Sequence, residues 1–186
     1  MRLFVAVNLP DPVRHNVRDL TRQLRDSRYP IRWVASEAMH ITLKFLGEVP
    51  DKKEDAITKS LEKAAAGVSR FALRLDRFGA FPNPRRARVV WVGCEAPAQI
   101  KQLHEQVEAG MSEIGFDREN RSFHPHVTLG RARRDASPSR LGGLSRMLES
   151  LVVDVEFPVT SVELMQSELS RAGAKYTVRA SIGLTG

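Results

Sequence analysis

Two short stretches of sequence decide the fold: His40-Ile41-Thr42-Leu43 and His126-Val127-Thr128-Leu129. Each places a histidine and a threonine two residues apart at the beginning of an apolar run. In a β-strand, residues two apart share one face, and the residue between them lies on the other. The two stretches therefore predict two strands that each present one imidazole and one hydroxyl on the same side.

A larger repeat surrounds the two stretches, which lie 86 residues apart. The same offset lays residues 2–7 on residues 88–93, and both runs are short, apolar and typical of a strand. Apolar residues at helical spacing follow each run. Each half thus has the order strand, helix, connection and motif strand, which we interpret as an internal duplication. It predicts two similar lobes that face each other, with one histidine–threonine pair from each.

The rest of the pattern favours an α+β fold with antiparallel sheets. We expect helices over 11–27, 53–66, 97–114 and 144–150. We expect strands over 2–9, 31–35, 40–46, 70–79, 87–94 and 124–131, and two or three antiparallel strands after residue 152. The predicted architecture is a two-lobed, pseudo-symmetric fold in which antiparallel sheets line a central cleft and the helices lie outside. The chain, 1–186, is predicted to be a single domain made of two intertwined lobes.

Composition limits the class of protein. The chain has 186 residues, of which 42% are hydrophobic and 27% charged, values typical of a soluble globular protein. No segment approaches the ~20 apolar residues of a membrane span, and the run from Leu3 to Val7 is too short for a signal peptide. Cys94 is the only cysteine, which excludes an intrachain disulfide and a thiolate-rich metal site. We therefore expect a cytoplasmic protein with no membrane association. We also expect a monomer, although composition does not determine the oligomeric state.

The positive charge favours a polyanionic partner. The formal net charge is +7. Basic residues gather in two places, at Arg85, Arg86 and Arg88 and at Arg131, Arg133 and Arg134. The second cluster directly follows the second motif, where it can meet substrate phosphates. Solvated basic loops are the alternative interpretation of both clusters.

Alternation along the two motif strands predicts which side chains face a cleft. His40, Thr42 and Lys44 are expected to face it, whereas the residues between them, Ile41, Leu43 and Phe45, pack under helices. In the second strand, His124 is expected to share a face with His126 and Thr128. The two remaining histidines, His15 and His104, lie in helical segments among charged residues and are expected at the surface.

A metal site is the main chemical alternative. His124-Pro125-His126 resembles a pair of histidine ligands, and His40 would complete three. However, neither motif contains Asp or Glu, and a hydroxyl two residues after each histidine is not a usual ligand set. We therefore predict no metal and no cofactor.

Two histidines and two hydroxyls around one anion suggest phosphoryl transfer without a metal. One imidazole removes a proton from the nucleophile, and the other, protonated, supplies a proton to the leaving oxygen. The threonine hydroxyls, with any nearby arginine, stabilise charge on the non-bridging oxygens. A strained cyclic phosphodiester suits these groups, because its alkoxide leaving group needs an acid.

The chain resembles a known family at these residues. It is similar to the 2H phosphoesterases, and within them to the RNA 2′,3′-cyclic phosphodiesterases, also called 2′-5′ RNA ligase-like proteins. Three strings carry the resemblance, which covers nearly the whole chain: RLFVAVNLP at 2–10, HITLKFLG at 40–47 and FHPHVTLGR at 123–131. Trp33, the string LMQSE at 164–168 and Tyr176 fit as well.

The resemblance implies an enzyme that hydrolyses a 2′,3′-cyclic phosphate at the end of an RNA, an oligonucleotide or a tRNA fragment to a 2′-phosphomonoester. By position, His40 would be the proton donor and His126 the acceptor, with Thr42 and Thr128 on the phosphate. Arg131 matches a frequent phosphate-contacting position, although simple alternation would point it away from Thr128 unless the strand bends at Gly130. Two alternatives remain open: 2′-5′ RNA ligase activity on tRNA halves, and a non-catalytic RNA-end-binding protein.

Overall fold

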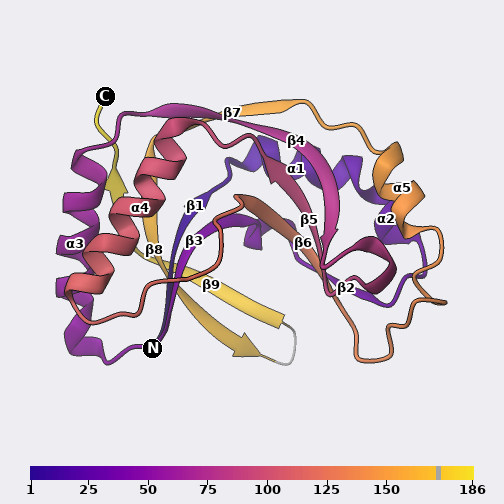
Figure 1. Cartoon of the computed structure of the whole chain (residues 1–186), viewed down its shortest axis with the longest axis horizontal. Coiled ribbons are helices and arrows are strands. Elements are labelled where there is room, and N and C mark those ends of the chain that lie inside the picture. The colour runs from indigo at the N-terminus through magenta and orange to yellow at the C-terminus, as the bar shows by residue number, and fades with distance from the viewer. Residues whose placement is uncertain (171–172) are drawn as a thin grey trace.

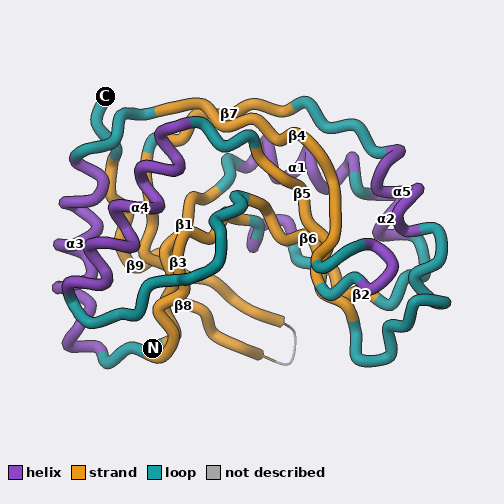
Figure 2. Tube along the Cα trace, viewed as in Figure 1, coloured by secondary structure: helices purple, strands orange, loops and turns teal. Residues whose placement is uncertain are grey.

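One curled antiparallel sheet runs through the chain, with helices at both ends of the arch that it forms (Figure 1, Figure 2). The computed structural model describes residues 1–170 and 173–186. The strands are β1 (Arg2–Asn8), β2 (Ile31–Trp33), β3 (His40–Glu48), β4 (Phe71–Phe81), β5 (Val89–Cys94), β6 (His126–Ala132), β7 (Val155–Val159), β8 (Ser161–Ser170) and β9 (Gly173–Gly183). The helices are α1 (Asp11–Leu20), α2 (Arg22–Asp26), α3 (Glu54–Ala66), α4 (Ala98–Glu113) and α5 (Leu144–Ser150), with the 3₁₀ turns η1 (Ser36–Ala38), η2 (Asp51–Lys53) and η3 (Pro84–Arg86). The α+β class predicted from the sequence is confirmed.

The two motif strands form the centre of the sheet. Its order is β7-β4-β5-β6-β3-β1-β8-β9, with β2 paired to β6 as a branch. The halves meet where β3 runs antiparallel to β6, through the pair Ile41 and Val127. These residues are equivalent in the repeat, since they lie 86 residues apart. A pseudo-two-fold axis makes equivalent residues face each other in this way.

The helices tie the two halves together. Helix α4 follows β5 in the chain, yet it packs against α3 and β3 of the other half, while α5 packs against β4. Figure 1 shows α3 and α4 at one end of the arch and α2 and α5 at the other. Among the described residues, none of the helices combines the length and the apolar character that a membrane span requires.

Both motif strands contain an irregularity at the same point. Pairing with the neighbouring strand shifts by one residue at Leu43 in β3 and at Leu129 in β6, again 86 residues apart. An extra residue in a strand inverts the alternation of faces beyond it. The burial of residues 40–45 and of 126–131 accordingly follows one pattern, in which two adjacent buried residues precede an exposed one.

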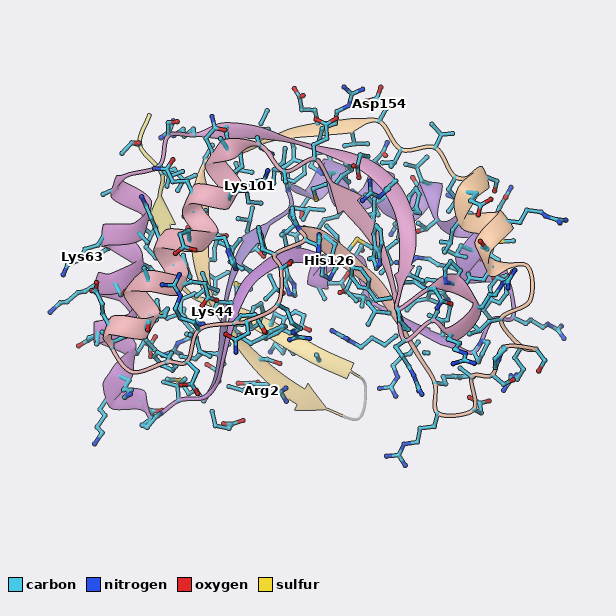
Figure 3. All side chains as sticks on the ribbon, viewed as in Figure 1. Arg2, Lys44, Lys63, Lys101, His126 and Asp154 are labelled. Atoms are coloured by element: carbon cyan, nitrogen blue, oxygen red, sulfur yellow. The ribbon has the colours of Figure 1, made fainter. Side chains whose placement is uncertain are left out.

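The bulge in β3 overturns one prediction from alternation. Lys44 does not face the cleft: it is only 5% exposed and points to the α4 side (Figure 3), whereas Phe45 is 67% exposed. The prediction assumed unbroken alternation and therefore assigned both side chains to the wrong face.

The strands beside the motif strands are not aligned at the offset of 86. Asn8 lies opposite His40, and Gly93 lies opposite His126. Asn8 and Gly93 are therefore equivalent, and β1 and β5 are related by an offset of 85 residues. Trp91 is therefore the counterpart of Ala6. The predicted alignment of residues 2–7 with 88–93 is wrong by one residue, because the second half has one residue more between β5 and β6 than the first half has between β1 and β3.

Lys44 forms a buried ion pair that connects the two halves. Its Nζ lies 2.8 Å from Glu108 Oε2 on α4 and donates to the carbonyl of Asp117 at 2.7 Å. The same carboxylate oxygen accepts from the backbone N–H of Glu119 at 3.1 Å. Residues 117–119 belong to the loop that leads to β6, so this pair links the first motif strand to the segment that precedes the second.

Glu108→Gln is expected to destabilise the protein by about 3–5 kcal/mol, because it leaves the Lys44 ammonium buried without a counter-charge. The free energy of unfolding in urea measures the loss. Glu105→Gln on the same helix is the control, since Glu105 is largely exposed beside Arg118 and should cost no more than about 1 kcal/mol. Equal stability of the two variants would contradict the role given to the pair.

Candidate active site

The two motif histidines are held in the same way. His40 Nδ1 lies 2.8 Å from the carbonyl of Ala38, and His126 Nδ1 lies 2.7 Å from the carbonyl of His124. A carbonyl oxygen only accepts, so each Nδ1 carries the proton, and each Nε2 keeps a free lone pair. Ala38 and His124 are again 86 residues apart. Each motif thus supplies a histidine with a fixed tautomer, able to accept a proton at Nε2 or to donate one when protonated.

The structure corrects the position of His124. Strand β6 begins at His126, and the side chain of His124 is exposed. Proline at 125 lacks an N–H and does not extend the strand backward. His124 therefore does not share a strand face with His126 as predicted; its backbone carbonyl orients the His126 ring.

Aromatic rings surround each histidine. Phe4 and Tyr176 lie 4.8 Å and 5.0 Å from the His40 ring between centroids. Phe81 lies 5.1 Å from the His126 ring, nearly perpendicular to it, and the Trp91 ring lies 6.4 Å away. These rings limit water around both imidazoles. The family resemblance included Tyr176 and the string that contains Phe4, but nothing in the sequence placed Phe81 or Trp91 beside His126, because they lie on β4 and β5.

Burial lowers the pKa of both histidines and so disfavours their charged forms. The pKa of His40 falls from 6.5 to about 4, mainly because the ring is buried. The hydrogen bond to the carbonyl of Ala38 raises this pKa, whereas the charges of Arg131, Arg14 and His126 lower it further. Burial also lowers the pKa of His126. The hydrogen bond to the carbonyl of His124 raises this pKa, and the charge of Arg131 lowers it. The charge of His126 acts on His40 and the charge of Arg131 acts on both, so the three groups lie near one another.

The pairing of β3 with β6 brings the threonines to the same face. With Ile41 opposite Val127, the antiparallel register sets His40 across from Thr128 and Thr42 across from His126. Within the described part of the chain, neither threonine hydroxyl forms a hydrogen bond with another protein group. Both hydroxyls are therefore available to an anion between the strands. Figure 3 shows His126 near the middle of the molecule, between the two ends of the arch.

Arg131 lies on the same strand face as Thr128 because of the bulge. The register shift at Leu129 turns Arg131 onto the face of Thr128, and its charge acts on both histidines. The bend that was expected at Gly130 lies one residue earlier, at Leu129.

Arg14 is a further cation near His40 that the sequence did not indicate. Its side chain donates to the carbonyls of Leu9, at 2.6 Å, and Glu37, at 2.8 Å. Arg14 lies on α1, outside the motifs, and no local pattern identifies it.

The other two histidines lie outside this site. His15 is exposed on α1, as predicted. The prediction for His104 is wrong: its ring stacks on Phe123 with centroids 4.0 Å apart, and Glu108 lies 4.0 Å from its Nε2. A helical pattern does not show that a loop will fold over the helix.

In the described residues, no three His, Cys, Asp or Glu side chains gather as metal ligands do.

A small hollow of about 120 Å³ opens beside His40, and Arg14, Tyr176 and Met165 contribute to its wall. A larger hollow of about 450 Å³ lies between β4 and β7, bounded by Phe71 and Phe157. It contains no part of either motif. The smaller hollow and the strand face beside it form the candidate site, because the titratable groups of the motifs gather there.

Anion binding should strengthen as the pH falls. An anion between the strands favours the imidazolium form and so raises the pKa of both histidines. By linkage, each proton that the histidines take up strengthens the binding of the anion. We expect sulfate, whose charge stays constant over this range, to bind at least about tenfold more tightly at about pH 5 than at about pH 8. Titration calorimetry measures the affinity. The same pH dependence in the double variant His40→Asn, His126→Asn would show that other groups bind the anion.

Comparison with known proteins agrees with this geometry. The family model described as the 2′-5′ RNA ligase superfamily matches residues 9–171. A relative from Methanothermobacter thermautotrophicus, named RNA 2′,3′-cyclic phosphodiesterase, is 33% identical over 177 residues, which is 95% of either chain.

Two crystal structures share the fold over the whole length. TT0787 of Thermus thermophilus superposes with a TM-score of 0.85 at 30% identity, covering 100% of this chain and 99% of its own. E. coli LigT complexed with 3′-AMP gives a TM-score of 0.79 at 30% identity, covering 100% and 98%. The similarity therefore includes both halves of the sheet and both motif strands.

Proposed function

The chain belongs to the 2′-5′ RNA ligase superfamily, and from this membership we propose that it is an RNA 2′,3′-cyclic phosphodiesterase that uses His40 and His126 as its acid and base. The observation that carries the proposal is the pairing of Ile41 with Val127, which brings both histidine–threonine motifs to one face. One phosphate between the two strands would contact groups from both.

The reaction is an in-line hydrolysis of the cyclic ester. His126 Nε2 accepts a proton from the attacking water, whose oxygen forms the new bond to phosphorus. The bond from phosphorus to the 3′ oxygen breaks, and the protonated His40 supplies the proton to that oxygen, which leaves the phosphate on the 2′ oxygen. Thr42, Thr128 and Arg131 donate to the non-bridging oxygens, where negative charge increases in the transition state.

The low pKa of His40 is compatible with an acid only when substrate is bound. The free imidazole is neutral near pH 7, because burial lowers its pKa to about 4. The negative charge of the cyclic phosphate beside the ring opposes this shift and favours the protonated form. His40 would therefore acquire its proton together with the substrate, which ties the acid to the presence of the phosphate.

One chain is sufficient for this chemistry. It supplies both histidines, both threonines and Arg131, which favours action as a monomer. Both halves also exchange elements, since α4 packs against β3, which favours a single domain of two intertwined lobes. RNA fragments with a cyclic phosphate end, tRNA fragments among them, are the proposed substrates, and such a substrate favours a cytoplasmic location.

End-group analysis tests the proposal. An RNA that ends in a 2′,3′-cyclic phosphate is incubated with the protein, and the product is compared by chromatography with 2′- and 3′-phosphate standards. We expect the 2′-phosphate. A 3′-phosphate product would mean that the 2′ oxygen is the leaving group, which would contradict the roles given to His40 and His126. Ligation to a second RNA would favour the ligase alternative. An unchanged RNA end would favour a non-catalytic RNA-end binder.

Activity should survive chelation. Two imidazoles supply the acid and the base themselves, so no metal-bound water is needed. We expect hydrolysis at an unchanged rate, within about twofold, in excess EDTA after prolonged dialysis. Complete loss of activity, followed by recovery on addition of a divalent metal, would show that the metal alternative is correct.

A further inference from the structure

A line of arginines continues from the site along β6. Arg131 lies opposite Arg32 of β2 in the antiparallel register, and Arg133 follows two residues after Arg131. The ladder continues to that point, since the backbone N–H of Arg133 donates to the carbonyl of Pro30 at 2.8 Å. All three side chains are exposed.

This arrangement is electrostatically unfavourable in the absence of a partner. Residues directly opposite in an antiparallel pair project from the same face, and like charges in such pairs are destabilising. Among the described residues, none of the three arginines forms a salt bridge or a side-chain hydrogen bond. Asp135, the acidic residue nearest to Arg131 and Arg133 in the sequence, forms its salt bridge with Arg140.

The line begins at the reacting centre. Arg131 acts on the pKa of both motif histidines, and Thr128 lies three residues before it. From Thr128 to Arg133 an extended strand covers about 15 Å. A polyanion whose end is held between the histidines would therefore meet Arg32 and Arg133 as it leaves the site.

Resting on the proposed function, we propose that Arg32 and Arg133 bind the phosphates of the RNA strand that precedes the cyclic end, and so make the enzyme prefer oligonucleotides to mononucleotides. Single-stranded RNA is the partner because its phosphates recur along a flexible backbone that can follow the strand. The two arginines bind phosphates and not bases, so the preference is independent of base sequence.

Substrate length provides the test. We compare kinetics with cytidine 2′,3′-cyclic phosphate and with an RNA of about ten nucleotides that ends in a 2′,3′-cyclic phosphate. Arg32→Gln and Arg133→Gln should each raise KM for the RNA roughly threefold to tenfold and leave kcat/KM for the mononucleotide unchanged. The slope of log KM against log salt for the RNA should also decrease by about 0.7 for each arginine–phosphate pair that a variant removes.

Lys63→Gln is the matched control. It removes one positive charge from an exposed position on α3, at the opposite end of the arch from β2 (Figure 1, Figure 3). It should leave KM for both substrates unchanged. Equal effects of all three variants on the RNA would indicate a dependence on net charge alone and would overturn the proposal, as would unchanged KM for the RNA in both arginine variants. Absence of hydrolysis of either substrate by the wild-type protein would instead reject the proposed function.

Discussion

Replacing His40 or His126 by alanine is expected to lower the rate of cyclic-phosphate hydrolysis roughly 100- to 10,000-fold in each case. Each imidazole has a fixed tautomer and a free Nε2, because its Nδ1 donates to a backbone carbonyl. The other groups placed at the phosphate are hydroxyls and guanidinium groups, which do not exchange a proton readily at pH 7. Neither imidazole therefore has a substitute at the site.

His15→Ala is the control for both variants, since His15 is exposed on α1 and away from the motifs. It should keep the wild-type kcat within about twofold. Circular dichroism and thermal unfolding show whether each variant is folded, so that a loss of rate can be assigned to the missing imidazole. Full activity in a folded His40→Ala or His126→Ala variant would reject the two-histidine mechanism.

Replacing Thr42 or Thr128 by valine is expected to lower kcat roughly 10- to 1000-fold, as the loss of one donor to the transition-state charge. Valine keeps the shape and the strand preference of threonine, so the change removes little besides the hydroxyl. The pseudo-symmetry of β3 and β6 predicts effects of similar size at both positions. The effect should appear mainly in kcat, because charge on the oxygens increases in the transition state.

Thr58→Val on α3 is the control for the hydroxyl variants, because Thr58 lies on a helix outside both motifs. Steady-state kinetics on one cyclic substrate compares all three. If Thr42→Val or Thr128→Val kept kcat within about twofold of the wild type, the hydroxyls would not hold the phosphate.

The central features could be predicted because they are repeated in the sequence. The offset of 86 between the motifs identified the two strands that meet at Ile41 and Val127, and the α+β class and the family predictions are confirmed. The assignment of His40, His126, Thr42, Thr128 and Arg131 to the reaction stays a prediction. The geometry supports it, and the variants above test it.

The errors came from local irregularities that a single sequence does not reveal. A bulge at Leu43 exchanged the faces of Lys44 and Phe45. One additional residue between β5 and β6, relative to the segment between β1 and β3, changed the offset of the neighbouring strands to 85. His104 is covered by Phe123 from the loop that follows α4. In each case tertiary packing, and not local pattern, decides where the side chain lies.

The most direct test of a single site is a histidine titration by NMR with cytidine 2′-monophosphate, the mononucleotide form of the expected product. The chain has five histidines, and His40→Asn and His126→Asn variants assign the two relevant signals. We expect that one equivalent of nucleotide shifts both signals with the same dissociation constant and raises both pKa values. A shift of only one histidine, or two shifts with different dissociation constants, would contradict the claim that both motifs hold one phosphate.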